Sequence, residues 1–158
     1  MISSIVYLSS PSETSTEQLA PVGTIRAFVH PDLGYQLLRS VKATTAVTAN
    51  EVVQYDSGSA ESVVKSSGAK QKACMIAGLA VSSIAAGSYG WVVCYGQAYA
   101  LAHSTIGAGS TLMTSATAGR VNDETVGGAE HTVIGIQISD ASAASAGDKI
   151  TIRVTSIL

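Results

Sequence analysis

The chain is 158 residues long, 46% hydrophobic and 13% charged, and its formal net charge at pH 7 is −2. This length and hydrophobic content predict one folded domain with its own core, and they exclude a disordered chain. The few Lys and Arg residues are scattered, which excludes a basic face for nucleic acid or anionic lipid, and no apolar run approaches the length of a membrane span.

Ala, Ser, Thr and Gly make up nearly half of the residues. A surface covered with Ser and Thr in place of Lys and Glu carries little charge to repel neighbouring proteins. Such a surface suits an extracellular protein, a virion protein or a subunit packed against others. It also fits a plain β-domain rich in small residues, so composition leaves these alternatives open.

The N-terminal part divides into two segments of different composition. Residues 1–8 are apolar and β-prone, whereas residues 9–20 are polar, contain a proline and show no strand pattern. We therefore predict an extended arm and linker over residues 1–21, followed by a single β-rich domain over residues 22–158. The arm residues predicted to bind a partner are Ile2, Ile5, Val6, Tyr7 and Leu8. The alternative is that residues 1–8 form the first strand of the domain itself.

The body of the chain begins with two predicted hairpins. Residues 24–29 and 35–41 are β-prone and flank turn-forming residues that include a proline and a glycine. Shorter β-prone runs at residues 52–55 and 62–65 flank a second turn, Asp56-Ser57-Gly58.

A short phrase occurs four times: Ala, then Gly or Asn, then two variable residues and usually an apolar one. Gly and Asn tolerate positive φ, so the phrase predicts a tight turn that launches a strand. The copies are Ala49-Asn50-Glu51-Val52-Val53, Ala86-Gly87-Ser88-Tyr89-Gly90, Ala108-Gly109-Ser110-Thr111-Leu112 and Ala146-Gly147-Asp148-Lys149-Ile150.

The densest apolar stretch is Met75 to Val81, and after the Ala86-Gly87 turn a second apolar run extends from Trp91 to Leu101. Strict alternation places Val92, Cys94, Ala98 and Ala100 on one face, and the opposite face is also largely apolar. A strand that is apolar on both faces is buried on both. The opposite face is therefore a candidate oligomer interface, made of Trp91, Val93, Tyr95 and Tyr99. A core strand covered by the chain's own loops explains the pattern equally well.

The C-terminal part contains a predicted loop and two predicted strands. Residues 119–131 are charged and glycine-rich, which is typical of a surface loop. Residues 133–138 are β-prone, and residues 149–155 alternate as a half-buried strand does. No window carries a capped helical stripe, and a single helical turn at 141–146 is the only helix considered. The predicted fold class is all-β.

No catalytic or metal-ligating constellation is visible. The three histidines have neither helical i, i+4 spacing nor a Cys partner nearby, so zinc ligation has no support: His30, His103 and His131. Asp123 and Glu124 lack the other ligands of a calcium loop, and Ser104 next to His103 points to the opposite face of a strand. We predict that the protein is not an enzyme and that it binds no metal and no cofactor.

The two cysteines, Cys74 and Cys94, lie in apolar β-prone runs. Two are too few for a disulfide framework, and the first residues lack the features of a signal peptide. We therefore expect synthesis and folding in the cytoplasm, with both thiols free and buried.

Several segments carry a resemblance to a known family. They are Gly23 to Phe28, Leu38 to Ala43, Ile84 to Val92, Gly96 to Leu112, Ser115 to Val121, and Val133 to Ile136 with the last strand. Together they span roughly residues 22–158 and resemble the head decoration, or capsid cement, proteins of tailed bacteriophages.

The resemblance implies a compact β-barrel-like or β-tulip domain on the exterior of a virion capsid. Family members assemble as homotrimers, bind the major capsid protein and brace its neighbouring copies after head expansion. The resemblance supplies no catalytic residue, and it implies no nucleic-acid or membrane partner.

The main alternative is a glycan- or ligand-binding β-domain of a phage spike or surface protein. In that case an exposed Trp91, Tyr95 or Tyr99 would stack on sugar. The aromatic residues cluster in the apolar strand, which favours packing over sugar binding.

Overall fold

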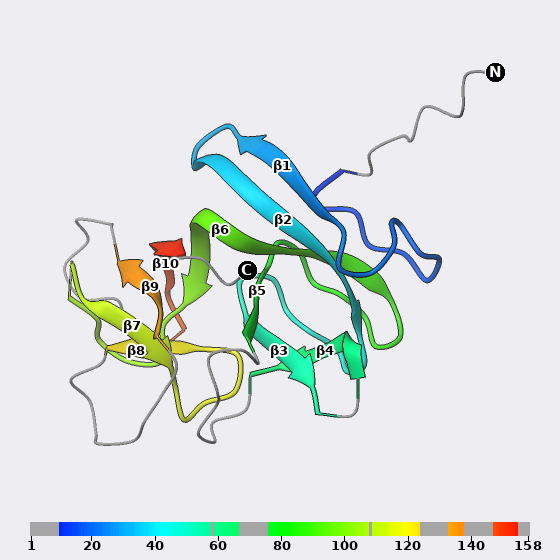
Figure 1. Cartoon of the computed structure of the whole chain (residues 1–158). Helices are drawn as coiled ribbons and strands as arrows, with labels where there is room; N and C mark the ends of the chain where they lie inside the picture. The colour runs from blue at the N-terminus through cyan, green and yellow to red at the C-terminus, as the bar shows by residue number, and fades with distance from the viewer. Residues whose placement is uncertain are drawn as a thin grey trace.

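β-strands form all of the regular secondary structure in the part of the chain that the computed structural model describes, which is residues 10–57, 59–66, 76–107, 109–123, 133–137 and 147–154 (Figure 1). This confirms the all-β prediction. The strands are β1 (Ile25–His30), β2 (Gly34–Ala43), β3 (Val52–Asp56), β4 (Ser59–Lys65), β5 (Ile76–Ala80), β6 (Tyr89–Leu101), β7 (Thr111–Thr114), β8 (Val121–Asp123), β9 (Val133–Gln137) and β10 (Lys149–Val154). Both predicted hairpins are present, and the predicted helical turn at 141–146 lies outside the described residues.

Five strands close into a small barrel. β2 pairs in parallel with β4, and antiparallel pairs then join β4 to β3, β3 to β5, β5 to β6 and β6 back to β2. All five strands contribute to one apolar cluster: Val41, Ala43, Val47, Val53, Val63, Ala77, Ala80, Ile84 and Val92. The barrel therefore has its own packed interior, as small closed sheets do.

A second wing of sheet grows out of the barrel because β6 is long. Its C-terminal half pairs with β10, and the order then runs through β9 and β7 to β8. A larger apolar cluster joins the wing to the barrel, since it includes Leu38 and Trp91 from barrel strands and Leu112 and Ile152 from the wing. The barrel and the wing therefore share one core.

The repeated phrase forms the predicted turn at each of its copies. The φ angles are 67° at Asn50, 80° at Gly87, 78° at Gly109 and 92° at Gly147, and a strand begins two residues after each one. The same arrangement precedes β1 at Gly23 (φ 87°) and β8 at Gly119 (φ 76°). One turn chemistry therefore starts strands in both the barrel and the wing.

The structure corrects the predicted faces of β6. Trp91 and Val93 share a cluster with Ala98 and Ala100, which strict alternation had placed on the opposite face. The register with β2 explains this, because Leu37 lies opposite Tyr95 and Leu38 opposite Val93, which leaves Cys94 as an extra residue. Such a bulge reverses the alternation beyond it.

The loop predicted at 119–131 is wrong for its first part. Residues 121–123 form β8, and both Val121 and Asn122 are buried. The pairing of Thr114 with Val121 explains this, because it places Val121 in the shared core. Residues 124–131 lie outside the described residues.

The segment before β1 packs on the body. Ser15 and Tyr89 exchange two backbone hydrogen bonds, of 3.2 and 2.7 Å, and Leu19 and Ala20 pack against the larger core. The polar composition of this segment predicts a free linker. Residues 15–20 instead pack on the domain, because Tyr89 at the start of β6 offers backbone partners to Ser15 and the larger core accepts Leu19 and Ala20. Residues 1–9, with the predicted arm residues Ile2, Ile5, Val6, Tyr7 and Leu8, lie outside the described part of the chain.

Candidate functional site

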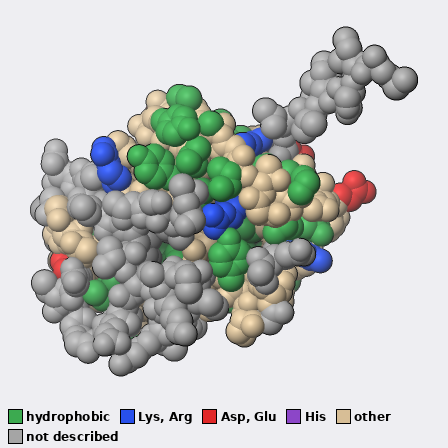
Figure 2. Space-filling model, in the orientation of Figure 1, with side chains coloured by type: hydrophobic (Ala, Val, Ile, Leu, Met, Phe, Trp, Pro, Cys, Tyr) green, Lys and Arg blue, Asp and Glu red, His purple; other side chains and the backbone are tan. Residues whose placement is uncertain are grey.

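The outer side of β1 carries exposed apolar side chains. Ile25 is 45% exposed and Val29 is 71% exposed, and Ala27 between them is also exposed. We call Ile25, Ala27 and Val29 the β1 face. Figure 2 shows hydrophobic side chains gathered over the region where Figure 1 places the β1–β2 hairpin.

β1 is also an edge strand. It pairs with β2 from Ile25 opposite Arg39 to His30 opposite Gly34. No backbone hydrogen bond joins its other edge to any residue that the structure describes. A strand with one unpaired edge and an apolar face is a ready partner for another strand.

A hollow lies beside the hairpin, where β2, β6 and β10 meet. Its volume is about 500 Å³, and it is lined by Leu33, Gly34, Tyr35, Tyr95, Gly96, Gln97, Arg153 and Val154. Tyr35 is 54% exposed and Tyr95 is 43% exposed. We call this feature the tyrosine hollow.

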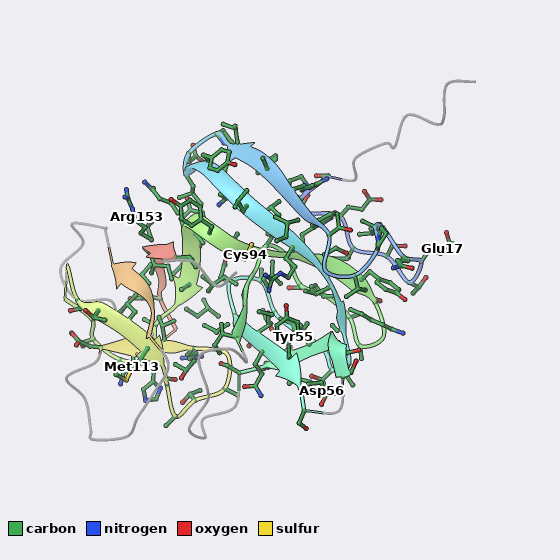
Figure 3. The ribbon with its side chains drawn as sticks, viewed as in Figure 1. Glu17, Tyr55, Asp56, Cys94, Met113 and Arg153 are labelled. Carbon is green, nitrogen blue, oxygen red and sulfur yellow. The ribbon has the colours of Figure 1, made fainter. Side chains whose placement is uncertain are left out.

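Gly96 shapes the tyrosine hollow. Its φ is +103°, and a Cβ built there would lie 2.4 Å from the backbone oxygen of Tyr35. Glycine alone therefore lets β6 run this close to the start of β2. On the other edge of β6, Gln97 lies opposite Arg153 of β10. The three strands β2, β6 and β10 therefore meet at the tyrosine hollow. Figure 3 shows Arg153 at the end of β10.

The four candidate interface residues on β6 differ in their exposure to solvent. Trp91 and Val93 are only 2% and 4% exposed and belong to the chain's own core, so they offer no surface to a partner. Their assignment to an oligomer interface is wrong, because this stretch packs in the shared core on one face and in the barrel interior, through Val92, on the other. Tyr95 is exposed, and Tyr99 is half-buried.

Trp91 and Tyr99 are also covered by cations. The Arg26 guanidinium lies 4.1 Å from the centroid of the Trp91 ring, and the Lys149 ammonium lies 4.0 Å from that of Tyr99. Burial lowers the pKa of Arg26 from its ordinary value, and the charge of Glu13 opposes that shift. Neither ring is therefore free to stack on a sugar, whereas Tyr95 is.

The Ser, Asp and His side chains with the potential for chemistry have structural partners. The Ser104 hydroxyl donates to Asn122 Oδ1 at 2.5 Å rather than to His103. The Ser110 hydroxyl donates to the Asp123 carboxylate at 2.6 Å, and His30 Nδ1 accepts from the backbone N–H groups of Asp32 and Leu33 in the hairpin turn. These contacts shape loops and turns.

Cys94 is buried with a free thiol, and its Sγ donates to the Leu37 carbonyl at 3.3 Å. Cys74 and His131 lie outside the described residues. Within the described ranges, no group of three or more His, Cys, Asp or Glu side chains gathers in a way that would hold a metal ion. The same ranges contain no helix with the length and apolar character needed to cross a membrane.

Sequence reasoning missed the β1 face, Tyr35 and Arg153. The sequence does carry a signal for the β1 face. Every second residue of β1, namely Ile25, Ala27 and Val29, is apolar, so these side chains lie together on one side of the strand. The tyrosine hollow had no such signal, since its residues come from strands far apart in the sequence.

Comparisons with known proteins give a likeness of fold. No protein-family model matches the chain, and no curated protein matches it. Among solved structures, the chain is similar to the N base of the head fiber protein gp8.5 of bacteriophage phi29, with 21% identity and a TM-score of 0.52. The match covers 75% of this chain and 92% of that one. The shared fold is that of a phage head fiber base, and the comparison does not single out the decoration family.

Proposed function

We propose that this protein is a structural protein of a phage virion that sits on the outside of the head and contacts the major capsid protein through the β1 face. The observation that carries the proposal is an exposed apolar edge strand on a fold similar to a phage head fiber base. The low charge of the chain supports close packing against other subunits. The role is one of contact and shape rather than of catalysis.

The proposed contact is the addition of a strand. A capsid segment in extended conformation pairs with the free edge of β1, and its apolar side chains cover Ile25 and Val29. Burying each of these side chains contributes on the order of 1.5–3 kcal/mol before the costs of association. The predicted arm, Ile2 to Leu8, adds a second contact of the same kind.

Cementing follows if several copies act together. We propose a homotrimer whose subunits each hold one capsid protein, so that neighbouring capsid proteins are tied through it. Linked contacts of moderate strength give a much tighter overall attachment than a single one. Sedimentation of the full chain, free and on heads, measures the number of subunits directly, and a monomer in both states contradicts the trimer.

Co-sedimentation tests the capsid contact. Heads of the phage that encodes the chain, prepared without this protein, are mixed with the full chain and pelleted. We expect the wild-type protein to pellet and Val29→Asp and Ile25→Asp to stay largely in solution, because a buried unpaired charge is costly. Thr45→Asp is the control, since Thr45 is exposed beyond the other end of β2.

Circular dichroism establishes that each variant is folded. If folded Val29→Asp and Ile25→Asp proteins pellet as well as the wild type, the β1 face is not the contact. If the wild-type protein itself fails to pellet, the capsid role is wrong.

A further inference from the structure

The tyrosine hollow has features that strand addition at β1 does not use. It lies where β2, β6 and β10 converge, and its volume of about 500 Å³ falls in the range typical of small-molecule sites, about 300–1,000 Å³. Its two aromatic residues are among the exposed large hydrophobic side chains of the described residues, at 54% for Tyr35 and 43% for Tyr95. A ligand site explains this exposure without a further protein.

We infer that the tyrosine hollow binds an acidic saccharide, that is, a sugar ring that carries a carboxylate. Sugar rings present apolar C–H faces and hydroxyl edges at once. Exposed tyrosines match the first with their rings and the second with their hydroxyls, since the side chain is an apolar body with a polar tip.

The charge in the hollow selects the acidic member of this class. Among the described residues that line it, Arg153 is the only charged one, and no carboxylate faces it. Arg153 is exposed and makes no ion pair with the described residues. A guanidinium holds a carboxylate with two parallel hydrogen bonds, so a neutral sugar leaves its main donor unused.

Gln97 completes the polar side. It lies opposite Arg153 in the β6–β10 pair, and its amide supplies a donor and an acceptor for ring hydroxyls. Tyr99, two residues further along β6, is not part of the site because Lys149 covers its ring. This excludes a longer aromatic platform along β6 and points to recognition of a short unit.

A matched pair of probes tests the inference on the full chain without capsids. Methyl β-D-glucuronoside and methyl β-D-glucoside differ only in the carboxylate at C6. In saturation-transfer NMR titrations we expect the glucuronoside to bind about tenfold more tightly than the glucoside. This difference corresponds to one charge-assisted hydrogen-bonded contact between Arg153 and the carboxylate.

Two variants separate the contributions. Arg153→Gln is expected to abolish the preference for the glucuronoside, and Tyr35→Ala to weaken both probes about tenfold. Lys42→Gln is the control, because it removes a cation at the far end of β2 that lies 5.5 Å from the Tyr89 ring. A heteronuclear NMR spectrum of each variant checks its fold.

The inference is overturned if neither probe binds at millimolar concentration, if both bind equally, or if Arg153→Gln keeps the preference. Because the assay contains no capsid, its result is independent of the capsid contact. Ile25→Asp, which lies opposite Arg39 at the other end of β1 and outside the hollow lining, is expected to bind both probes as the wild type does.

Discussion

At the scale of single residues, two left-handed glycines serve different purposes. A Cβ at Gly87 (φ +80°) meets nothing within 4 Å, whereas a Cβ at Gly96 (φ +103°) meets the Tyr35 backbone oxygen at 2.4 Å. We expect Gly87→Ala to lower the unfolding free energy by about 1–2 kcal/mol, because alanine is strained in the left-handed conformation and meets no other atom there. Gly96→Ala adds a clash with backbone and should cost about 3–5 kcal/mol. Urea denaturation compares the two, and equal losses would contradict the close approach of β2 and β6.

Cys94 predicts a dependence of stability on alkaline pH. Burial raises the pKa of its thiol above the ordinary value of 9.0, while the charge of Arg39 opposes the shift. Well below pH 9 the thiol is neutral in both the folded and the unfolded chain. As the pH rises further, the unfolded thiol ionises first, so the stabilisation that Cys94 provides is lost.

Cys94→Ala isolates this effect from the other alkaline groups. We expect the variant to be about 1–2 kcal/mol less stable than the wild type at pH 7, and the gap to shrink by pH 10. Urea denaturation of both proteins at each pH measures the gap. A gap that stays constant shows that the thiol has no raised pKa.

At the scale of elements, Glu51 ties the start of β3 to the end of β4. Its carboxylate accepts the Thr48 N–H at 2.7 Å and pairs with Lys65 Nζ at 3.0 Å. The Glu51 side chain is 10% exposed and that of Lys65 is 38% exposed. We expect Glu51→Ala to cost about 1–3 kcal/mol, because it removes two partners at a buried site.

Lys65→Met should cost less than about 1 kcal/mol, because the Lys65 side chain is 38% exposed and an exposed ion pair contributes little to stability. Thermal or urea unfolding of the two variants orders the costs. A larger loss for Lys65→Met would show that the ion pair, and not the Glu51–Thr48 hydrogen bond, holds this corner of the barrel.

The strands that the sequence predicts correctly are those with local signals. The phrase at Asn50, Gly87, Gly109 and Gly147 specifies its turn through the residue that tolerates positive φ, and such a preference is local. The faces of β6 could not be predicted in the same way. The bulge at Cys94 depends on the register between β6 and β2, and β2 lies more than fifty residues earlier in the chain. The alternation of apolar and polar residues within a single strand carries no information about that register.

The same limit applies to the candidate site. The exposure of Val29 follows from a local alternation, whereas the tyrosine hollow exists only because Tyr35, Gly96 and Arg153 are brought together by three strands. Local sequence patterns carry no information on such convergence.

At the scale of the whole molecule, the shared core joins the barrel and the wing into one body that carries the β1 face. The larger apolar cluster draws on β2, β3, β5, β6, β7, β8 and β10, so the wing buries its apolar side chains against the barrel. Phe28 of β1 packs against the same cluster, so β1 is joined to this core, which suits the proposed role of bracing neighbouring capsid proteins.

Low charge predicts how attachment to heads responds to salt. The chain is 13% charged with a net charge of −2, and the β1 face consists of Ile25, Ala27 and Val29. Salt at about 1 M reduces the screening length to about 3 Å and weakens exposed ion pairs, but it leaves apolar burial intact. We expect the Kd for heads to change less than about threefold between about 0.1 M and 1 M NaCl, measured by quantitative co-sedimentation.

Val29→Asp provides the contrast, because any residual binding it shows should depend on electrostatic contacts and fall with salt. A loss of tenfold or more for the wild-type protein would mean that charged residues make the capsid contact, and the β1 face would then be the wrong surface.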